Sequence, residues 1–356
     1  MAALVPDHLV AVGVDTHADF HVAVAGDQLG RVLDTVTVPT TKHGYASLLA
    51  WALEHGTVVG FGVEGTGSWG AGLARYLLSR GQRVVEVHQA DRALRRRRGK
   101  SDALDAEAAM RAVLGGHVAT PKRQDGTVEM IRALRVARRS AMLARIQAGN
   151  QLHGLLARAP EELRTQLRGL RTAKLATTVA AFRPGAGPPT TVVGAAKVAM
   201  RELGRRYLAL QAEINRLEEV VQPLVGEVAP GLLALPGVGP ETAAALLEAA
   251  GDNPERLTSE AAFALLCGVA PLPASSGKIT RHRVNPGGNR QANEALWRIV
   301  LVRMKCHLPT RAYVERRTKE GLSKPEIMRC LKRYVAREVY RHLRPRPLSP
   351  KGSSRL

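Results

Sequence analysis

Four carboxylates in the first 105 residues have the type and spacing of a metal-binding site. Asp15 and Glu64 each end an apolar run of the kind that forms a buried strand. Asp102 and Asp105 are three residues apart, which places both on one face of a helix. Buried acids need partners, and acids from two strand ends and one helix can converge on a pair of divalent cations. Hard carboxylate oxygens favour Mg²⁺ or Mn²⁺ over zinc, as in two-metal phosphodiester chemistry.

Two histidines accompany these acids in the sequence. His17 follows Asp15 by two residues, and His88 ends a later apolar stretch. An imidazole in such a place can transfer a proton during phosphodiester chemistry. Ordinary histidines at strand ends are the simpler interpretation, and both interpretations stay open.

The elements that must position the acids follow a particular order. Strand-like segments joined by Asp19 and by the turn 26–28 predict three successive strands, over 8–16, 20–25 and 31–39. A helix over 43–55, the strand that ends at Glu64, a helix to about Arg80 and a strand over 83–88 follow. Three strands in a row, then alternating helices and strands, are expected of a ribonuclease-H-like (RuvC-like) α/β domain. In that fold the first and fourth strands, which would carry Asp15 and Glu64, are neighbours.

The charge is extreme and unevenly distributed. The chain has 52 Lys/Arg against 31 Asp/Glu, a formal net charge of +21. Residues 1–90 carry five basic and eight acidic side chains, whereas residues 301–356 carry sixteen and four. This distribution predicts a polyanionic partner. The alternative is an arginine-rich soluble surface without a nucleic-acid role.

The cysteines and the chain start favour a reducing compartment. Cys267, Cys306 and Cys330 are far apart and form no CxxC pair, so neither a disulfide framework nor a structural zinc site is predicted. We expect all three thiols in the core of a cytoplasmic protein. No signal peptide or transmembrane run is visible, and no basic face carries Trp or Phe anchors, so no membrane partner is expected.

A basic run directly precedes the Asp102/Asp105 helix. Its candidate contacts to a nucleic-acid backbone are Arg95, Arg96, Arg97, Arg98 and Lys100. Four consecutive arginines beside an acid cluster can hold a backbone while the acids hold metal. The alternatives are a solvated charge run and a purely structural helix start, with Ser101 as N-cap and Asp102 in the favourable first turn.

A heptad pattern occupies the middle of the chain. The predicted core positions are Met130, Leu134, Ala137, Ala141, Ala144 and Ala148 in a first arm, and Met200, Leu203, Tyr207, Leu210, Ile214, Leu217, Val221 and Leu224 in a second. Steps of three and four residues predict an α-helical coiled-coil linker. A Pro/Gly-rich segment over 183–189 separates the arms, and Pro223 marks the end of the second. The arms can pair within one chain, between chains, or both.

The C-terminal third is mainly helical and basic. Gly237 and Gly239 lie in a helix-hairpin-helix-like stretch that can offer backbone N–H groups to a phosphate, although a structural helix pair explains them too. Lys278, Arg281 and Arg283 are further candidates for phosphate contact, with surface solvation as the alternative. The predicted domains are therefore 1–125 (α/β), 126–228 (coiled coil) and 229–346 (mainly α), followed by a disordered tail over 347–356.

Taken in order, several motifs resemble those of the DEDD-type insertion-sequence transposases, a family related to the pilin-gene invertases. The motifs are Gly-Val-Asp-Thr at 13–16, Val-Glu-Gly-Thr-Gly at 63–67, Lys-Ser-Asp-Ala-Leu-Asp-Ala at 100–106, Leu-Pro-Gly-Val-Gly at 235–239 and Gly-Val-Ala-Pro at 268–271 leading to Ser-Gly at 276–277. Each motif is short, but their order and separations cover nearly the whole chain. The resemblance is therefore specific.

The resemblance implies a RuvC-like domain, a coiled-coil linker and a C-terminal domain with a serine nucleophile, which maps to Ser276. The adjacent Ser275 departs from the family pattern and leaves the nucleophile open between the two. The resemblance also implies donor and target DNA, a structured noncoding guide RNA and, as in serine recombinases, a covalent phosphoserine link. A homo-oligomer, dimer or tetramer, is expected because recombination joins two duplexes.

Together these observations predict a DNA transposase or recombinase. Asp15, Glu64, Asp102 and Asp105 would bind Mg²⁺, and Ser276 would attack the scissile phosphate so that the covalent intermediate conserves the phosphodiester energy. One alternative is a RuvC-like structure-selective endonuclease, which uses the four acids without Ser276. The other is a non-catalytic nucleic-acid-binding scaffold in which the acids are structural.

Overall fold

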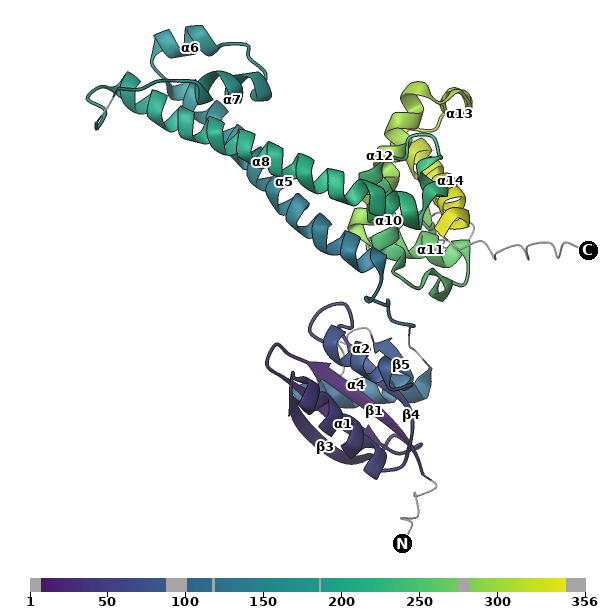
Figure 1. Cartoon of the computed structure of the whole chain (residues 1–356). Helices are drawn as coiled ribbons and strands as arrows, with labels where there is room; N and C mark the ends of the chain where they lie inside the picture. Colours follow the sequence, from purple (N-terminus) through teal and green to yellow (C-terminus); the bar gives the residue numbers. More distant parts are fainter. Residues whose placement is uncertain (1–7, 88–100, 117–118, 186, 275–281, 344–356) are drawn as a thin grey trace, which may run out of the picture. The chain divides into compact units, whose positions relative to one another are not determined.

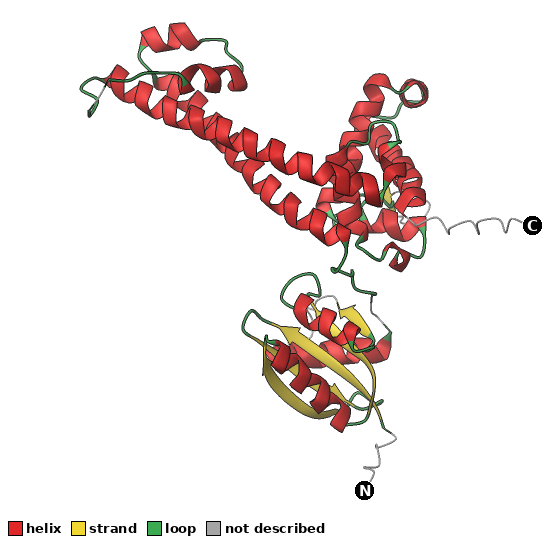
Figure 2. Ribbon diagram, viewed as in Figure 1, coloured by secondary structure: helices red, strands yellow, loops and turns green. Residues whose placement is uncertain are grey.

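A computed structural model of the chain describes residues 8–87, 101–116, 119–185, 187–274 and 282–343 (Figures 1 and 2). The chain forms two compact units, of which the first is Met1–Gly126 with Ala250–Ser259 and the second is Thr127–Ala249 with Glu260–Leu356. Several sequence predictions lie outside the described residues. These concern His88, Arg95, Arg96, Arg97, Arg98, Lys100, Ser275, Ser276, Lys278, Arg281 and the tail from 347.

The first unit is built on a mixed five-stranded sheet. The strands are β1 (Leu9–Thr16), β2 (Phe20–Gly26), β3 (Val32–Pro39), β4 (Thr57–Glu64) and β5 (Val84–Val87), in the order β3-β2-β1-β4-β5. β1, β2 and β3 pair antiparallel, whereas β4 is parallel to both β1 and β5. The predicted strands and the β1–β4 neighbourhood are confirmed. The topology fits a ribonuclease-H-like domain.

Helices cover both faces of this sheet. α1 (Lys42–Glu54) and α2 (Ala71–Ser79) pack with Val12, Val14 and Val63 on one face. α4 (Asp102–Gly115) packs through Ala106, Met110 and Val113 on the other face, against Ala11 and the valines of β2 and β5. Because side chains alternate along a strand, the face that buries Ala11 is also the face toward which Asp15 points.

Glycines allow α4 to lie directly on the strands. A Cβ atom on Gly13 of β1 would lie 2.0 Å from the Ala106 carbonyl oxygen, and one on Gly62 of β4 would lie 2.7 Å from the Ala109 carbonyl oxygen. Both distances are too short for real Cβ contacts, so neither position accepts a side chain without moving the helix. The close approach brings the first turn of α4 to the strand ends.

The second unit is helical. Its long helices, α5 (Thr127–Arg158) and α8 (Val192–Val228), lie side by side, with α6 (Glu161–Leu167) and α7 (Thr172–Ala180) at one end (Figure 1). Arg138 contacts Glu218 and Arg145 contacts Gln211, so the two long helices run antiparallel. At the other end lie α9 (Pro230–Leu233), α10 (Pro240–Ala250), α11 (Glu260–Leu266), α12 (Arg290–Cys306), α13 (Leu308–Lys319) and α14 (Lys324–Leu343). Leu272–Pro273 (β6) and His282–Arg283 (β7) form a two-stranded ribbon.

The predicted core positions agree with the structure fully in one arm and in part in the other. All eight positions of α8 are buried or half-buried. In α5 the predicted positions 134, 141, 144 and 148 are buried or half-buried, whereas Met130 is 54% exposed and Ala137 is exposed. The prediction for α5 was wrong at these two positions, and it missed buried Arg135, which an apolar pattern does not register.

Two further expectations fail. α8 continues through Pro223 to Val228. Pro223 and Glu219, whose carbonyl loses its usual helical partner there, are both exposed, so water can satisfy that oxygen. Of the three thiols, only Cys267 is fully buried, and burial raises its pKa to about 12; Cys306 is exposed and Cys330 is half-buried.

A segment from far along the chain completes the first unit. Ala250–Ser259, which includes the 3₁₀ turn Pro254–Arg256, belongs to that unit although it follows α10. Buried Asn253 donates from Nδ2 to the Pro121 carbonyl at 3.0 Å and accepts from the Arg123 amide at 2.8 Å. These two bonds give the Pro121 carbonyl and the Arg123 amide hydrogen-bond partners from a distant segment.

Candidate metal-binding site

The site begins with Asp15 near the carboxyl end of β1. Parallel pairing of β1 with β4 aligns Val14 with Val63, so Asp15 and Glu64 are the next positions of the two strands. Both therefore lie at the same edge of the sheet and, by alternation, on the face that α4 covers. Asp15 is only 8% exposed, and the Thr16 hydroxyl donates to the Glu64 carbonyl at 2.9 Å, which ties the two strand ends together.

The first turn of α4 supplies the other two acids. Ser101 caps the helix, because its side chain accepts from the Leu104 amide at 3.3 Å. Asp102 and Asp105 lie in the first turn, as predicted, where the helix dipole favours negative charge. Asp105 is 5% exposed, whereas the Asp102 side chain is 38% exposed. The capping role and the site role that the sequence left open are thus compatible.

His17 lies between two of these acids. Its Nε2 is 3.2 Å from Asp15 Oδ2 and 3.3 Å from Asp102 Oδ2. The ring also lies against Phe20, with 4.9 Å between centroids, which limits its orientation. From the sequence, His17 was interpreted either as an ordinary strand-end histidine or as a group that transfers a proton. The structure instead makes it a neighbour of both carboxylates, and its separation of two residues from Asp15 was the available signal.

The electrostatics of the site are unbalanced. Burial raises the pKa of Asp15 above its ordinary value, and the nearby carboxylates of Asp102 and Asp105 raise it further, while His17 opposes the shift. Mutual repulsion of buried carboxylates is the condition that a bound cation relieves.

The donor set fits a divalent cation. One ligand atom each from Asp15, His17 and Asp102 lie within 4.8 Å of one another. The pKa shift on Asp15 places Asp105 in the same group, and Glu64 stands at the adjoining strand end. Carboxylate oxygens with one imidazole suit Mg²⁺ or Mn²⁺, although the imidazole also suits softer ions.

Three of the predicted phosphate contacts, Gly237, Gly239 and Arg283, are described residues of the second unit. Gly237, with φ of 75°, turns the chain between α9 and α10 above Arg303, whose Nε donates to the Pro236 carbonyl at 2.7 Å. The Gly239 amide donates to the Thr242 hydroxyl at 3.0 Å, so this N–H group is engaged within the hairpin. Arg283 is exposed on β7. These three residues belong to the second unit, whereas the four acids belong to the first.

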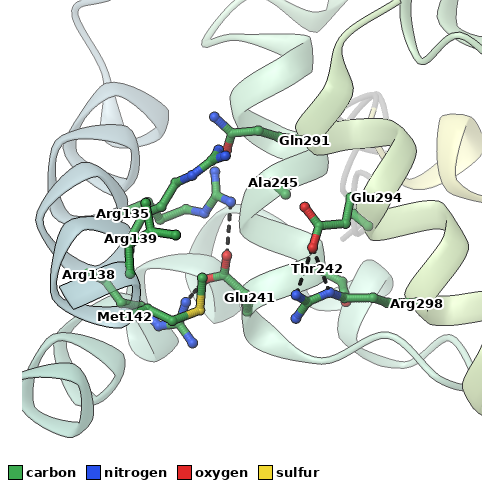
Figure 3. Close-up of a pocket in the computed structure, with 12 residues that line it drawn as sticks. Arg135, Arg138, Arg139, Met142, Glu241, Thr242, Ala245, Gln291, Glu294 and Arg298 are labelled. Carbon is green, nitrogen blue, oxygen red and sulfur yellow. Dashed lines mark hydrogen bonds and ion pairs between the residues drawn. The ribbon is translucent and has the colours of Figure 1, made fainter. Parts of the chain in front are cut away.

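A cavity of about 190 Å³ in the second unit is lined by several arginines, of which Arg135 and Arg138 are paired with glutamates (Figure 3). Buried Arg135 of α5 bonds to Glu241 at 2.9 Å and also contacts Glu248, both on α10. Arg138 bonds to Glu241 at 3.1 Å and to Glu218 of α8. This network joins three helices, and we interpret it as structural.

The fold fits a ribonuclease-H-like domain, and comparisons with known proteins agree with it. The model of IS110-type DEDD transposases, described as "Transposase", matches residues 12–159. The model described as "Transposase IS116/IS110/IS902 family" matches residues 229–315. The chain belongs to the IS110 family of DEDD-type insertion-sequence transposases.

A curated relative carries a name from the same family. It is the "Insertion element IS110 uncharacterized 43.6 kDa protein" of Streptomyces coelicolor, 32% identical over 162 residues. The match covers 45% of this chain and 38% of the relative. Within the described ranges, no helix combines the length and hydrophobicity that a membrane span needs.

Proposed function

We propose that the chain is a DNA transposase that cuts and rejoins phosphodiester bonds of donor and target DNA. The observation that carries the proposal is the convergence of Asp15, His17 and Asp102 at the edge of a ribonuclease-H-like sheet. Membership of a transposase family supports the same activity. A scaffold without catalysis does not explain why the buried carboxylate of Asp15 lies beside a second acid and a histidine.

In this proposal Asp15, Glu64, Asp102 and Asp105 hold divalent cations, Mg²⁺ in the first place and Mn²⁺ as a substitute. A bound cation supplies Lewis-acid polarisation of the scissile phosphate. Asp15 is fixed by its strand and Asp102 by a capped helix start, so their positions are set before substrate arrives. His17 is within reach of both and can hold a proton or serve as a further ligand.

A finer part of the proposal concerns the nucleophile. Ser276, with Ser275 as the alternative, attacks the scissile phosphorus; the serine oxygen–phosphorus bond forms as the bond to the leaving DNA oxygen breaks. The serine loses its proton to a base, and the leaving oxygen gains one. Rejoining reverses these transfers, so no net oxidant, reductant or ATP is needed. This step rests on the Gly-x-x-Pro…Ser-Gly motif alone, because both serines lie outside the described residues.

Two partners complete the proposal. A structured noncoding RNA would choose the DNA sites by base pairing, which leaves little need for base-reading side chains. A homo-oligomer would bring two duplexes together, with contacts between long helices as one route to assembly. The high positive charge supports polyanionic partners of either kind.

A denaturing gel tests the proposal. Full-length protein is incubated with element-end DNA, RNA transcribed from the flanking region, and Mg²⁺. We expect a covalent protein–DNA adduct that disappears in Ser276→Ala and Asp102→Asn and persists in Asp19→Asn, a variant of an exposed neighbouring acid outside the site.

The alternative gives a different gel. Metal-dependent cutting without an adduct in wild type, abolished by Asp102→Asn and unaffected by Ser276→Ala or Ser275→Ala, would favour the structure-selective endonuclease. Loss of the adduct in Ser275→Ala alone would move the nucleophile to Ser275. Cutting that survives in Asp102→Asn would contradict the acid site.

A further inference from the structure

An exposed tryptophan stands on the loop that leaves the acid site. Trp69 is 62% exposed, although indole is among the most apolar side chains. It lies in the loop 65–70, which connects Glu64 at the end of β4 to α2. Single exposed apolar residues need no explanation by themselves. The position and rigidity of this one make it informative.

The loop is held by several backbone bonds. The amides of Ser68 and Gly70 both donate to the Gly65 carbonyl, at 2.8 and 3.1 Å. Gly65 has φ of 66°, and a Cβ atom on Gly70 would lie 2.8 Å from a Val63 methyl group. The residue after Trp69 is therefore bonded to the residue after Glu64, which fixes the backbone that carries the indole close to the strand end.

A cationic groove begins at the same loop. It has a volume of about 520 Å³ and lies between Thr66, α2 and the segment 122–125. Gln124 Nε2 donates to the Thr66 carbonyl at 3.4 Å and so links the segment to the loop. Arg75, Lys122 and Arg123 line the groove with a single acid, Asp125, which pairs with Arg123 at 2.8 Å. The lining therefore carries a net positive charge, which suits a phosphate backbone.

We infer that this loop and groove bind unpaired DNA next to the scissile phosphate, with a base stacked on Trp69 and backbone phosphates along Arg75 and Lys122. The inference rests on the proposed function and names the form of its substrate. An indole face binds the face of a base, which duplex DNA hides and single strands expose. The cations recognise the backbone without regard to sequence.

Other occupants fit less well. Apolar residues of α2, such as Leu78, also line the groove and suit the faces of bases as well as an apolar helix; the cationic side chains beside them favour a strand with a phosphate backbone. A metabolite would need a more enclosed pocket with convergent polar groups. Unpaired DNA matches both the aromatic surface and the charge, and the cleavage chemistry proposed for the acids acts on DNA.

Intrinsic fluorescence tests the inference, because stacking on a base quenches indole emission. The full chain is titrated with oligodeoxythymidylate in EDTA, which prevents metal-dependent cleavage, and binding is followed in parallel by the anisotropy of a labelled oligonucleotide. We expect quenching in wild type and in Trp297→Phe, which changes an exposed tryptophan of the second unit. Quenching should be absent in Trp69→Phe, whose smaller ring still supports binding.

Affinity gives a second readout. Trp69→Ala should weaken oligonucleotide binding about 5- to 100-fold, the range expected for loss of one stacked base. Arg75→Gln should weaken binding and reduce the slope of log affinity against log salt by about 0.7, as for one phosphate contact to a single strand. Melting temperatures of the variants should match wild type because both side chains are exposed.

The outcomes separate the inference from the proposed function. If the oligonucleotide binds by anisotropy, but the Trp69 variants show the same quenching and the same affinity as wild type, the inference is overturned and the transposase proposal is left intact. No binding to single-stranded or duplex DNA would contradict both. Quenching by oligouridylate but not by oligodeoxythymidylate would overturn the assignment to DNA.

Discussion

The backbone of Met110 lies where a Gly13 side chain would be: a Cβ atom on Gly13 would be 2.1 Å from the Met110 nitrogen. Strand β1 and helix α4 thus touch backbone to backbone, two residues before Asp15. This contact sets the distance between the acid on the strand and the two acids at the start of the helix.

A methyl group at Gly13 should therefore act on the fold and the site together. Gly13→Ala is expected to lower the free energy of unfolding by about 3 kcal/mol, the upper range for overpacking, because only backbone atoms could yield. It should also displace Asp102 and Asp105 and remove any Mg²⁺-induced rise in Tm. Gly60→Ala is the matched control, because a Cβ atom there meets nothing closer than 3.5 Å. Equal Tm values for the two variants would contradict this account.

Asp15 should cost stability when no cation is bound. Its pKa is raised by burial and by the neighbouring acids. A carboxyl group with a raised folded pKa stabilises the fold below its unfolded value of about 3.9 and loses that contribution as pH rises through the folded value. At pH 7 in EDTA, Asp15→Asn should therefore have a higher Tm than wild type and a smaller gain from Mg²⁺ or Mn²⁺. Asp34→Asn should not stabilise, since the Trp51 N–H donates to Asp34 and lowers its pKa. A lower Tm for Asp15→Asn would oppose the argument.

His21 should make the first unit sensitive to acid. It is fully buried on β2, its ring stacks on Tyr45 at 5.8 Å, and burial lowers its pKa, with the charge of His17 acting in the same direction. A histidine with a lowered folded pKa contributes full stability above its unfolded value of about 6.5, and this contribution falls as pH decreases through that value. The Tm of His21→Phe should therefore fall less than that of wild type between pH 7.5 and pH 5. His43→Gln, at an exposed position of α1, should follow wild type; parallel curves for all three proteins would refute the prediction.

Arg135 should be costly to remove. It is 7% exposed and pairs with Glu241 and Glu248, so truncation removes a cation that two partly buried acids share and leaves Glu241 paired with Arg138. Arg135→Ala is expected to lower the free energy of unfolding by about 3–5 kcal/mol. Arg132→Ala, on the same helix, removes a half-exposed pair with Glu129 and should cost less than about 1 kcal/mol. Denaturant unfolding of both variants measures the difference, and similar losses would argue against the network.

The first unit was readable from sequence because its signals are local. Strand-like segments separated by turn residues indicated β1, β2 and β3, and the order of elements indicated that the strands of Asp15 and Glu64 are adjacent. The burial of Arg135 in α5 could not be predicted, since its partners are glutamates more than 100 residues away. The role of Asn253 could not be predicted either, because its partners, Pro121 and Arg123, precede it in the sequence by 132 and 130 residues. Contacts between residues so far apart in the sequence produce no periodic pattern of apolar residues.

The docking of residues 250–259 also sets an order of events during synthesis. The ribosome makes the five strands first, but the backbone at 121–123 receives its Asn253 partners only after α5 and α8 have been translated. The α/β unit therefore lacks its segment 250–259 while about 120 residues of the helical unit are synthesised, at roughly 5–20 residues per second. A fragment truncated near residue 126 would remain in that nascent state, whereas a chain released after residue 259 could close it.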